Sequence, residues 1–407
     1  MKEKIKSLSE KYFNEVVSLR RHLHANPELS FEEYNTSAFV CSKLDEWKIP
    51  YKKGMVKTGI VALIEGEKEP HPRPLSEGRG EQRCVALRAD LDALPIKEEN
   101  NKEYISKNSG VMHACGHDVH TSSLLGAAKI LNELKNEFEG TVKLIFQPGE
   151  EKLPGGASLM INEGVLKNPE PESIFAQHVF PSMETGKVGF RSGMYMASTD
   201  EIYITVKGKG GHAAMPANYV NPLLIASKLL VALQAEFMDE KTRSIPNIPT
   251  VLAFGKVTGM GATNVIPDEV KIEGTFRTMD EKWREEAHEK MKDIAAKVFS
   301  ENGGSGEFNI MRGYPFLVNN EELTNKAIAN AKEFLGAENV EMLDLRMTAE
   351  DFAFYSQHIP ACFYRLGTGN KKLGITSGVH TSTFDIDEEA LKTGMGLMAW
   401  LAVKELE

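Results

Sequence analysis

Three histidines, a cysteine and an aspartate lie within eight residues, 113–120, which read H-A-C-G-H-D-V-H. Cys115 and His117 are two positions apart, so on an extended segment their side chains point to the same side. A thiolate and an imidazole are good ligands for late first-row divalent metals. The alternative is a small buried cysteine beside polar loop histidines. The octet favours metal binding, and the rest of the chain decides between the two interpretations.

A pair of aspartates follows residues 84–89, whose apolar and β-branched composition predicts a buried strand. Ligand sites in α/β folds lie beyond the carboxyl ends of such strands, which is where Asp90 and Asp92 stand. Either aspartate can orient a metal-bound histidine through its far nitrogen. The alternative, that both only form the turn before Pro95, agrees equally well with turn chemistry.

A pair of glutamates follows a second predicted strand, residues 141–146. Glu150 and Glu151 are adjacent and point in different directions, so one can bind a metal while the other transfers protons. A pair of surface acids is the alternative. A short apolar strand from residue 173 then ends in His178, so we expect all these side chains to converge at one edge of one sheet.

The order of strands and helices predicts an α/β fold with two domains. Up to residue 190 and again from residue 302, strands alternate with helices, which is typical of a helix-flanked, mainly parallel sheet. Residues 191–301 instead read strand, helix, strand, strand, helix, which indicates a smaller α+β domain. We therefore expect a discontinuous metal-binding catalytic domain, residues 1–190 and 302–407, with residues 191–301 inserted into it.

Local patterns give three further expectations. Residues 2–25 have helical spacing. Ser30 is placed as an N-cap, with Glu33 completing a capping box for a second helix that ends near Trp47. Residues 70–81 are rich in proline, glycine and charge, and we expect a solvated hairpin extension without chemistry there.

Four polar residues in the second half of the chain stand in suggestive positions. His212 lies in a glycine-rich loop, Asn264 lies in T-N-V-I-P-D, and Arg277 lies near a strand end. Each can be an ordinary loop or surface residue, although an arginine at such a position can also bind a carboxylate with both guanidinium arms. His380 follows a glycine-rich loop and precedes the closing helix.

The overall composition excludes several classes of function. A net charge of −10 without a basic stripe argues against nucleic acid as a partner. No apolar run approaches the length of a membrane span. The four cysteines show no paired spacing, which predicts a reducing, cytoplasmic location.

The chain resembles the dinuclear-metal amidohydrolases of the aminoacylase/carboxypeptidase family over nearly its full length. The nearest likeness is the branch of N-acyl-amino-acid amidohydrolases, hippurate hydrolases and auxin-conjugate hydrolases. The motifs that carry the resemblance are R-R-H-L-H-A-N-P-E-L-S-F-E-E, A-L-R-A-D-L-D-A-L-P-I, M-H-A-C-G-H-D-V-H-T, F-Q-P-G-E-E, G-G-H-A-A-M-P, T-N-V-I-P-D, G-T-F-R-T, A-E-D-F-A-F-Y and V-H-T. Together they are highly specific, although no single one is.

This resemblance implies an active site and a reaction. It implies two divalent ions per chain (manganese, zinc, cobalt or nickel), Glu150 as the general base, and hydrolysis of N-acyl-amino acids to a carboxylic acid and an amino acid. It implies that residues 191–301 form a lid and a homodimer interface. There, His212, Asn264 and Arg277 would bind the substrate, with His212 able to reach across the dimer. The implied metal ligands are Cys115, His117, Glu151, His178 and His380.

The chain departs from the family pattern after the glutamate pair, where it has Lys152-Leu153-Pro154, and at Ala349, where serine is usual. Neither change removes an implied ligand. A dipeptidase or carboxypeptidase with the same metals is the alternative reaction. A metal-binding protein without activity is disfavoured by the Glu150-Glu151 pair. A cysteine nucleophile at Cys115 is also disfavoured, because a base two residues away is poorly placed to serve it.

Overall fold

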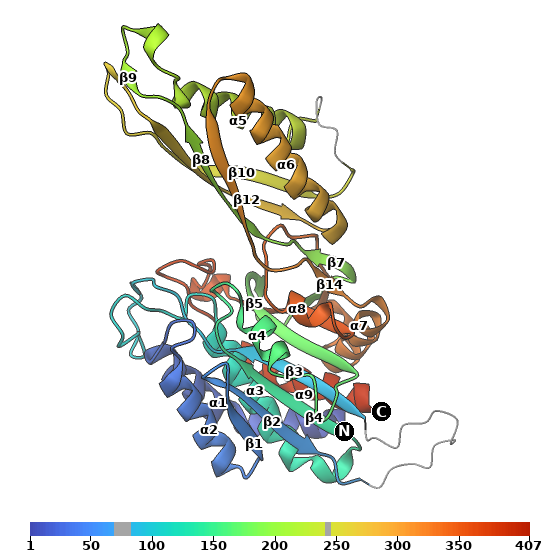
Figure 1. Ribbon diagram of the computed structural model, residues 1–407. Helices are drawn as coiled ribbons and strands as arrows, with labels where there is room; N and C mark the ends of the chain where they lie inside the picture. The colour runs from blue at the N-terminus through green and yellow to red at the C-terminus, as the bar shows by residue number, and fades with distance from the viewer. Residues whose placement is uncertain (69–82, 241–245) are drawn as a thin grey trace, which may run out of the picture. The chain divides into compact units, whose positions relative to one another are not determined.

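The computed structural model describes residues 1–68, 83–240 and 246–407. The chain divides into a large unit, Met1–Gly193, Val318–Asp344 and Asp351–Glu407, and a small unit, Met194–Leu317 and Leu345–Glu350 (Figure 1). The expected hairpin at residues 70–81 lies outside the described residues. Among those that are described, no helix is long and apolar enough to cross a membrane.

The large unit is built on an eight-stranded sheet with the order β1-β2-β4-β3-β5-β16-β6-β15. Its middle strands β4, β3, β5 and β16 run parallel, whereas β1, β2 and β6 pair antiparallel with their neighbours towards the sheet centre. This confirms the predicted α/β class with a mainly parallel sheet. The strands are β1 (Tyr51–Met55), β2 (Gly59–Glu65), β3 (Cys84–Asp90), β4 (Thr141–Gln147), β5 (Ser173–Glu184), β6 (Val188–Phe190), β15 (Val340–Met342) and β16 (Ala361–Gly369).

Three long helices pack together against this sheet: α1 (Lys2–Ala25), α3 (His117–Glu133) and α9 (Ala390–Leu406). The buried positions of α1 recur every three or four residues from Ile5 to Leu23, so one face of the helix enters the core. In contrast, α3 and α9 are buried nearly all round because they lie between α1 and the sheet. Shorter helices complete the unit: α2 (Tyr34–Glu46), α4 (Gly156–Asn162), α7 (Glu321–Leu335) and α8 (Ala353–Ser356).

The predicted N-cap of the second helix is wrong. Helix α2 starts at Tyr34, and the Ser30 hydroxyl donates to Asp92 at 2.6 Å instead of capping the helix. The amides of Asn35 and Thr36 donate to the side chain of Glu28, which therefore takes the capping role. A capping box is a local pattern, and here a partner 62 residues away competes for the serine.

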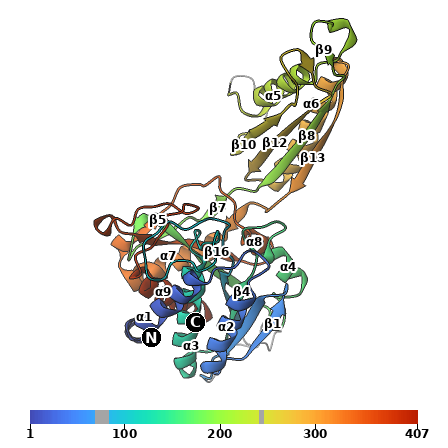
Figure 2. The same cartoon turned by 90° about the vertical axis from the view of Figure 1, so that its left-hand side faces the viewer.

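The small unit holds a four-stranded antiparallel sheet with the order β10-β12-β8-β13 and two helices on it (Figure 2). Alternate residues of β8 face these helices and are buried, for example Ile202 and Ile204. The elements are β8 (Asp200–Lys207), α5 (Pro222–Phe237), β10 (Thr250–Thr258), β12 (Glu269–Thr278), α6 (Glu281–Glu301) and β13 (Ser305–Arg312). The unit extends past the expected boundary at residue 301, because β13 pairs with β8 along its whole length.

Candidate metal centre

The candidate site is formed where polar loops leave the carboxyl ends of β3 and β4, beside the middle of β5. Strand β3 ends at Asp90, and β4 ends at Gln147, three residues before Glu150. His178 was expected at the end of a short strand, but β5 continues to Glu184, so His178 lies inside it. The loop that carries His380 approaches the same place, because the His380 amide donates to the carbonyl of Ala114 at 2.7 Å.

Cys115 and His117 are not on an extended segment. Gly116 between them adopts a left-handed conformation with φ of 84°, and α3 begins at His117. A Cβ atom at this glycine would lie 2.6 Å from a methyl carbon of Val179, so both the backbone and the available space require glycine. The turn still brings donor atoms of Cys115 and His117 within 4.8 Å of each other.

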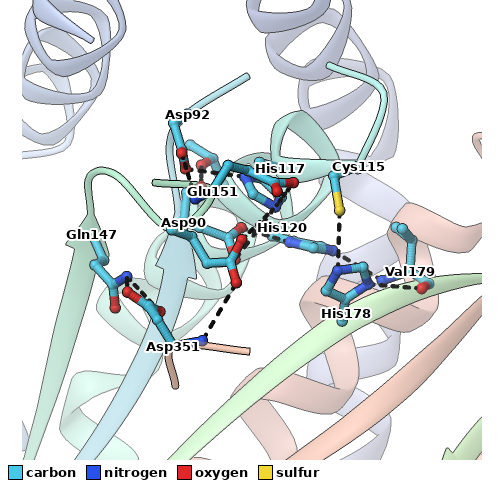
Figure 3. Close-up of polar contacts among 12 residues, drawn as sticks. Asp90, Asp92, Cys115, His117, His120, Gln147, Glu151, His178, Val179 and Asp351 are labelled. Carbon is cyan, nitrogen blue, oxygen red and sulfur yellow. Dashed lines mark hydrogen bonds and ion pairs between the residues drawn. The ribbon is translucent and has the colours of Figure 1, made fainter. Parts of the chain in front are cut away.

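Two groups of donor atoms share Cys115. One contains Cys115, His117 and His178, and the other contains Cys115, Glu151 and His380, with all donor atoms of a group within 4.8 Å of one another. The thiol sulfur lies 3.4 Å from Nε2 of His178 (Figure 3), and it also lies 3.3 Å from Nε2 of His380. Two ligands bound to one tetrahedral ion at ~2.1 Å are about 3.4 Å apart, so these separations suit metal coordination.

Two buried polar atoms in the site have no hydrogen-bond partner among the described residues, Nε2 of His117 and Oε1 of Glu151. Nε2 of His117 lies 3.8 to 4.0 Å from carboxylate oxygens of Asp90, Glu150 and Glu151, which is too far for hydrogen bonds. Oε1 of Glu151 lies 3.4 Å from Nε2 of His380 in an ion-pair contact, but the carboxylate oxygens around Nε2 of His117 are all more distant, and leaving that nitrogen unpaired in a buried site is unfavourable. The mixed nitrogen, sulfur and oxygen donors therefore fit a divalent cation.

The charges of the site also favour a cation. Burial, with Glu151 and Glu150 next in effect, raises the pKa of the Cys115 thiol well above its usual value. Burial alone would lower the pKa of His117, but Asp90 and Asp92 outweigh burial and raise it to about 10. Without a metal, both side chains thus hold protons at neutral pH, and a bound cation would replace those protons.

Asp92 fixes the orientation of His117. Its Oδ1 lies 3.2 Å from Nδ1 of His117, and its Oδ2 accepts from the amide of Glu151 at 2.9 Å. A proton on Nδ1 leaves the lone pair of Nε2 facing the donor groups, which is the usual arrangement for a metal-binding histidine. One aspartate thereby connects two candidate ligands.

Asp90 acts through a different histidine. The Val179 amide donates to Nε2 of His120 at 2.9 Å, so His120 carries its proton on Nδ1 and donates it to Asp90 at 2.6 Å. Both ring nitrogens are used, which argues against His120 as a ligand although it lies close to Asp90 and His117. The carbonyl of Val179 accepts from Nδ1 of His178 at 2.9 Å, which turns Nε2 of His178 towards Cys115.

A buried network behind Glu150 was missed in the sequence. The amide of Asp351 lies 3.4 Å from Oε1 of Glu150, and the Asp351 carboxylate accepts from Arg88 at 2.8 Å and from Gln147 at 2.7 and 2.8 Å. Arg88 also donates to Asp90 at 2.5 Å. The sequence did contain a signal for this network. Arg88 and Gln147 are polar residues in otherwise mainly apolar strands, and such residues are buried only when they are paired.

The candidate substrate-binding residues all belong to the small unit, and the structure brings only two of them together. β9 (Gly211–His212) pairs with β11 (Val265–Ile266), and the Ala213 amide donates to the carbonyl of Asn264 at 3.0 Å. Arg277 lies near the far end of β12, and its guanidinium donates to the carbonyl of Met347 at 3.2 Å. Eight residues of strand separate it from Glu269, or about 26 Å at ~3.3 Å per residue.

Comparison with known proteins gives consistent results. The profile of peptidase family M20/M25/M40 matches residues 86–404. An IAA-amino acid hydrolase of Arabidopsis thaliana (ILR1-like 5) is 38% identical over 98% of this chain and 88% of its own. Thermostable carboxypeptidase 2 of Saccharolobus solfataricus is 35% identical over 99% and 98%. The crystal structure of Bacillus subtilis YXEP, a dinuclear metal-binding peptidase, is 32% identical, covers 98% of this chain and 99% of that one, and has a TM-score of 0.80.

Proposed function

Because the chain belongs to peptidase family M20/M25/M40, whose enzymes hydrolyse amide bonds, we propose that it is a metal-dependent amidohydrolase of N-acyl-amino acids. Its products are a carboxylic acid and a free amino acid. The observation that carries the proposal is the pair of donor groups that share Cys115, with Glu150 beside them. The similarity to a plant IAA-amino acid hydrolase supports an acyl-amino acid as the substrate class.

We propose that the donor groups hold two divalent ions, manganese, zinc, cobalt or nickel. His117 and His178 would hold one ion and Glu151 and His380 the other, and Cys115 could contribute to both because it belongs to both donor groups. Such ions, when bound, polarise the scissile carbonyl and make the attacking water more acidic. The similarity to a dinuclear metal-binding peptidase supports the number of ions.

Glu150 is the proposed general base. Its side chain is 9% exposed, and the nearby amide of Asp351 helps to hold it in one orientation. Glu150 takes a proton from the attacking water, whose oxygen bonds to the carbonyl carbon. It then delivers that proton to the leaving nitrogen as the carbon–nitrogen bond breaks. The reaction consumes one water and releases both products.

Arg277 is proposed to bind the free carboxylate of the substrate, and His212 and Asn264 its carbonyl. Arg277 is half-buried, and its pKa is lowered by burial, so a carboxylate that reaches it gains a strong ion pair. Arg277 lies about 26 Å along β12 from Glu269. The loop that carries His212 lies at the Glu269 end, since the Gly210 amide donates to Asp268. His212 and Arg277 of one chain are therefore too far apart to contact the same small substrate. This supports a homodimer through the inserted domain, in which His212 serves the site of its partner.

The proposed location is the cytoplasm. All four cysteines are buried and free, and Cys115 needs a reduced thiol to act as a ligand. A reducing compartment keeps thiols in that form.

A carboxypeptidase or dipeptidase is the second candidate, and the similarity to a thermostable carboxypeptidase favours it. Both reactions use the same base and metals, and both substrates end in a free carboxylate. The difference is whether the acyl side carries an amino group. The geometry of the metal groups alone supports both reactions equally.

A substrate panel separates the two candidates. Metal-reconstituted protein is assayed with N-acetyl-, N-benzoyl- and indoleacetyl-amino acids, with plain dipeptides, and with the methyl ester of each active substrate. We expect turnover of acyl-amino acids, faster than that of dipeptides, and a large loss on esterification because the carboxylate charge is removed. Cleavage of dipeptides alone would favour the second candidate. Inactivity towards all of them would contradict the proposed function.

Inhibitors test the metal mechanism against a cysteine nucleophile. A chelator should abolish turnover, and added metal should restore it. Thiol alkylators should act slowly on metal-loaded protein, since Cys115 is only 6% exposed. Rapid inactivation by alkylators together with resistance to chelators would instead favour the nucleophile.

A further inference from the structure

The turn between α1 and α2 contains the motif E-L-S-F-E-E, residues 28–33, to which the proposed function gives no role. Phe31 in this turn has φ of 66°, a left-handed conformation that is unusual for a residue with a bulky side chain. Such a conformation persists only where the surroundings impose it, and it often occurs near functional sites. The contacts of the turn show what imposes it here.

Glu33 holds together two residues with left-handed backbones. Its Oε1 accepts from the amide of Phe31 at 2.8 Å and from the amide of Gly149 at 2.9 Å. Its Oε2 accepts from the hydroxyl of Thr58 at 2.7 Å. Glu33 is fully buried, so it has no freedom to exchange these donors for water. The carboxylate thus connects the turn to the loop that carries Glu150.

Gly149 packs so closely against Phe31 that there is no room for a side chain at residue 149. Gly149 has φ of 61°, and a Cβ atom there would lie 2.4 Å from the ring of Phe31. The aromatic ring therefore packs directly on the glycine backbone, while Glu33 holds its amide. Packing and hydrogen bonding together fix the residue immediately before Glu150.

The residue immediately after Glu150 is held from the same turn through an aspartate. The amide of Glu151 donates to Oδ2 of Asp92 at 2.9 Å, and the Ser30 hydroxyl donates to the same oxygen at 2.6 Å. The backbone of Glu150 thus lies between two amides that are both fixed by residues 30–33, one directly and one through Asp92.

We infer that the 30–33 turn positions the general base, with Glu33 as a positioning residue that never touches the substrate. The inference rests on the proposed role of Glu150. Catalysis is sensitive to displacements of about 1 Å in a base, because proton transfer requires hydrogen-bond distance to the water. Release of the Gly149 amide should therefore lower kcat while the binding of substrate and metal is preserved.

The test compares Glu33→Ala with Glu33→Gln and with a matched control, Glu28→Ala. Glutamine keeps an oxygen for both amides and can donate to Thr58, so it should retain kcat within about threefold. Alanine removes all three contacts and should lower kcat at least tenfold, with KM and bound metal within twofold of wild type. Glu28 lies in the same turn but caps α2, so Glu28→Ala should lower stability without lowering kcat.

Hydrogen exchange of the amides of Gly149 and Glu151 tests the inference without any turnover. Glu33→Ala should accelerate exchange at Gly149 at least tenfold, and Glu28→Ala should leave it unchanged. If Glu33→Ala does not fold, Ser30→Ala should accelerate exchange at Glu151 in its place. Unchanged exchange at Gly149 in Glu33→Ala, unchanged exchange at Glu151 in Ser30→Ala, or a full kcat in Glu33→Ala would overturn the inference. If Glu33→Ala accelerates exchange at Gly149 but the wild-type protein hydrolyses no amide, the result would contradict the proposed function and leave the role of the turn intact.

Discussion

The guanidinium of Arg88 is a buried cation that donates to two carboxylates behind the site, and its removal should destabilise the large unit. Arg88 is 1% exposed and donates to Gln147 at 3.0 Å, to Asp90 at 2.5 Å and to Asp351 at 2.8 Å. Arg88→Met keeps the length of the side chain and leaves both carboxylates buried without this cation. Removing one partner of a buried ion pair typically costs about 3–5 kcal/mol.

The expected loss lies at the lower end of that range. Asp351 keeps the donors of Gln147 and Ala157, and Asp90 keeps the donor of His120. We therefore expect Arg88→Met to lower the free energy of unfolding by about 3 kcal/mol. Arg88→Lys retains the charge but not the forked donors, so its loss should be smaller, ~1–2 kcal/mol.

Urea unfolding, monitored by hydrogen exchange of individual peptides, measures the loss in free energy of unfolding for each unit separately. Arg284 is a matched control because it is equally buried, pairs with Asp200 at 2.5 Å, and belongs to the small unit. Arg284→Met should destabilise the small unit and leave exchange in β3 and β4 unchanged. A loss below about 1 kcal/mol in Arg88→Met would refute the reasoning, because it would mean that the carboxylates gain little from the cation.

Three further predictions follow from the site. Glu150→Gln should retain bound metal and lower kcat by roughly 10²–10⁴-fold, which is the usual contribution of a general base. Near-normal turnover would show that Glu150 is not the base. Metal affinity, measured by competition with a chelator, should rise with pH by up to ~100-fold per unit, because Cys115 and His117 both give up protons on binding; an affinity independent of pH would contradict this. Gly116→Ala should lower metal affinity and stability by forcing Val179 away, as judged by calorimetry, whereas an unchanged protein would show that the turn can adapt.

The sequence was sufficient to predict the sheet that carries the site. Strands β3 and β4 are mainly apolar and buried along their whole length, which is typical of buried parallel strands, and the polar residues that follow them do converge. The donor atoms of the implied ligands also lie close together. Backbone pattern and residue type are local properties, and they were enough to predict the sheet and the edge at which polar residues meet. The full set of ligands was implied only by the resemblance to a known family.

Other features depend on contacts between residues far apart in the chain, which no local pattern reveals. Ser30 matches the sequence pattern of a helix N-cap, but its hydroxyl donates to Asp92. Glu33 matches the second position of the capping box, but its carboxylate accepts from the amide of Gly149. His120 has the same residue type as His117, and only its two occupied nitrogens distinguish it. The predicted end of the small unit was placed too early in the chain. Strand β13 has few apolar residues, so its sequence gives little signal of a further strand after α6.

The central claim is that Cys115 and its neighbours hold two ions next to Glu150. Anomalous diffraction from crystals of manganese-loaded protein, measured near the manganese absorption edge, tests it most directly. The account predicts two peaks about 3.5–4 Å apart, both within bonding distance of the Cys115 sulfur. One should lie by His117 and His178, and the other by Glu151 and His380. A single peak, or peaks away from Cys115, would contradict the account.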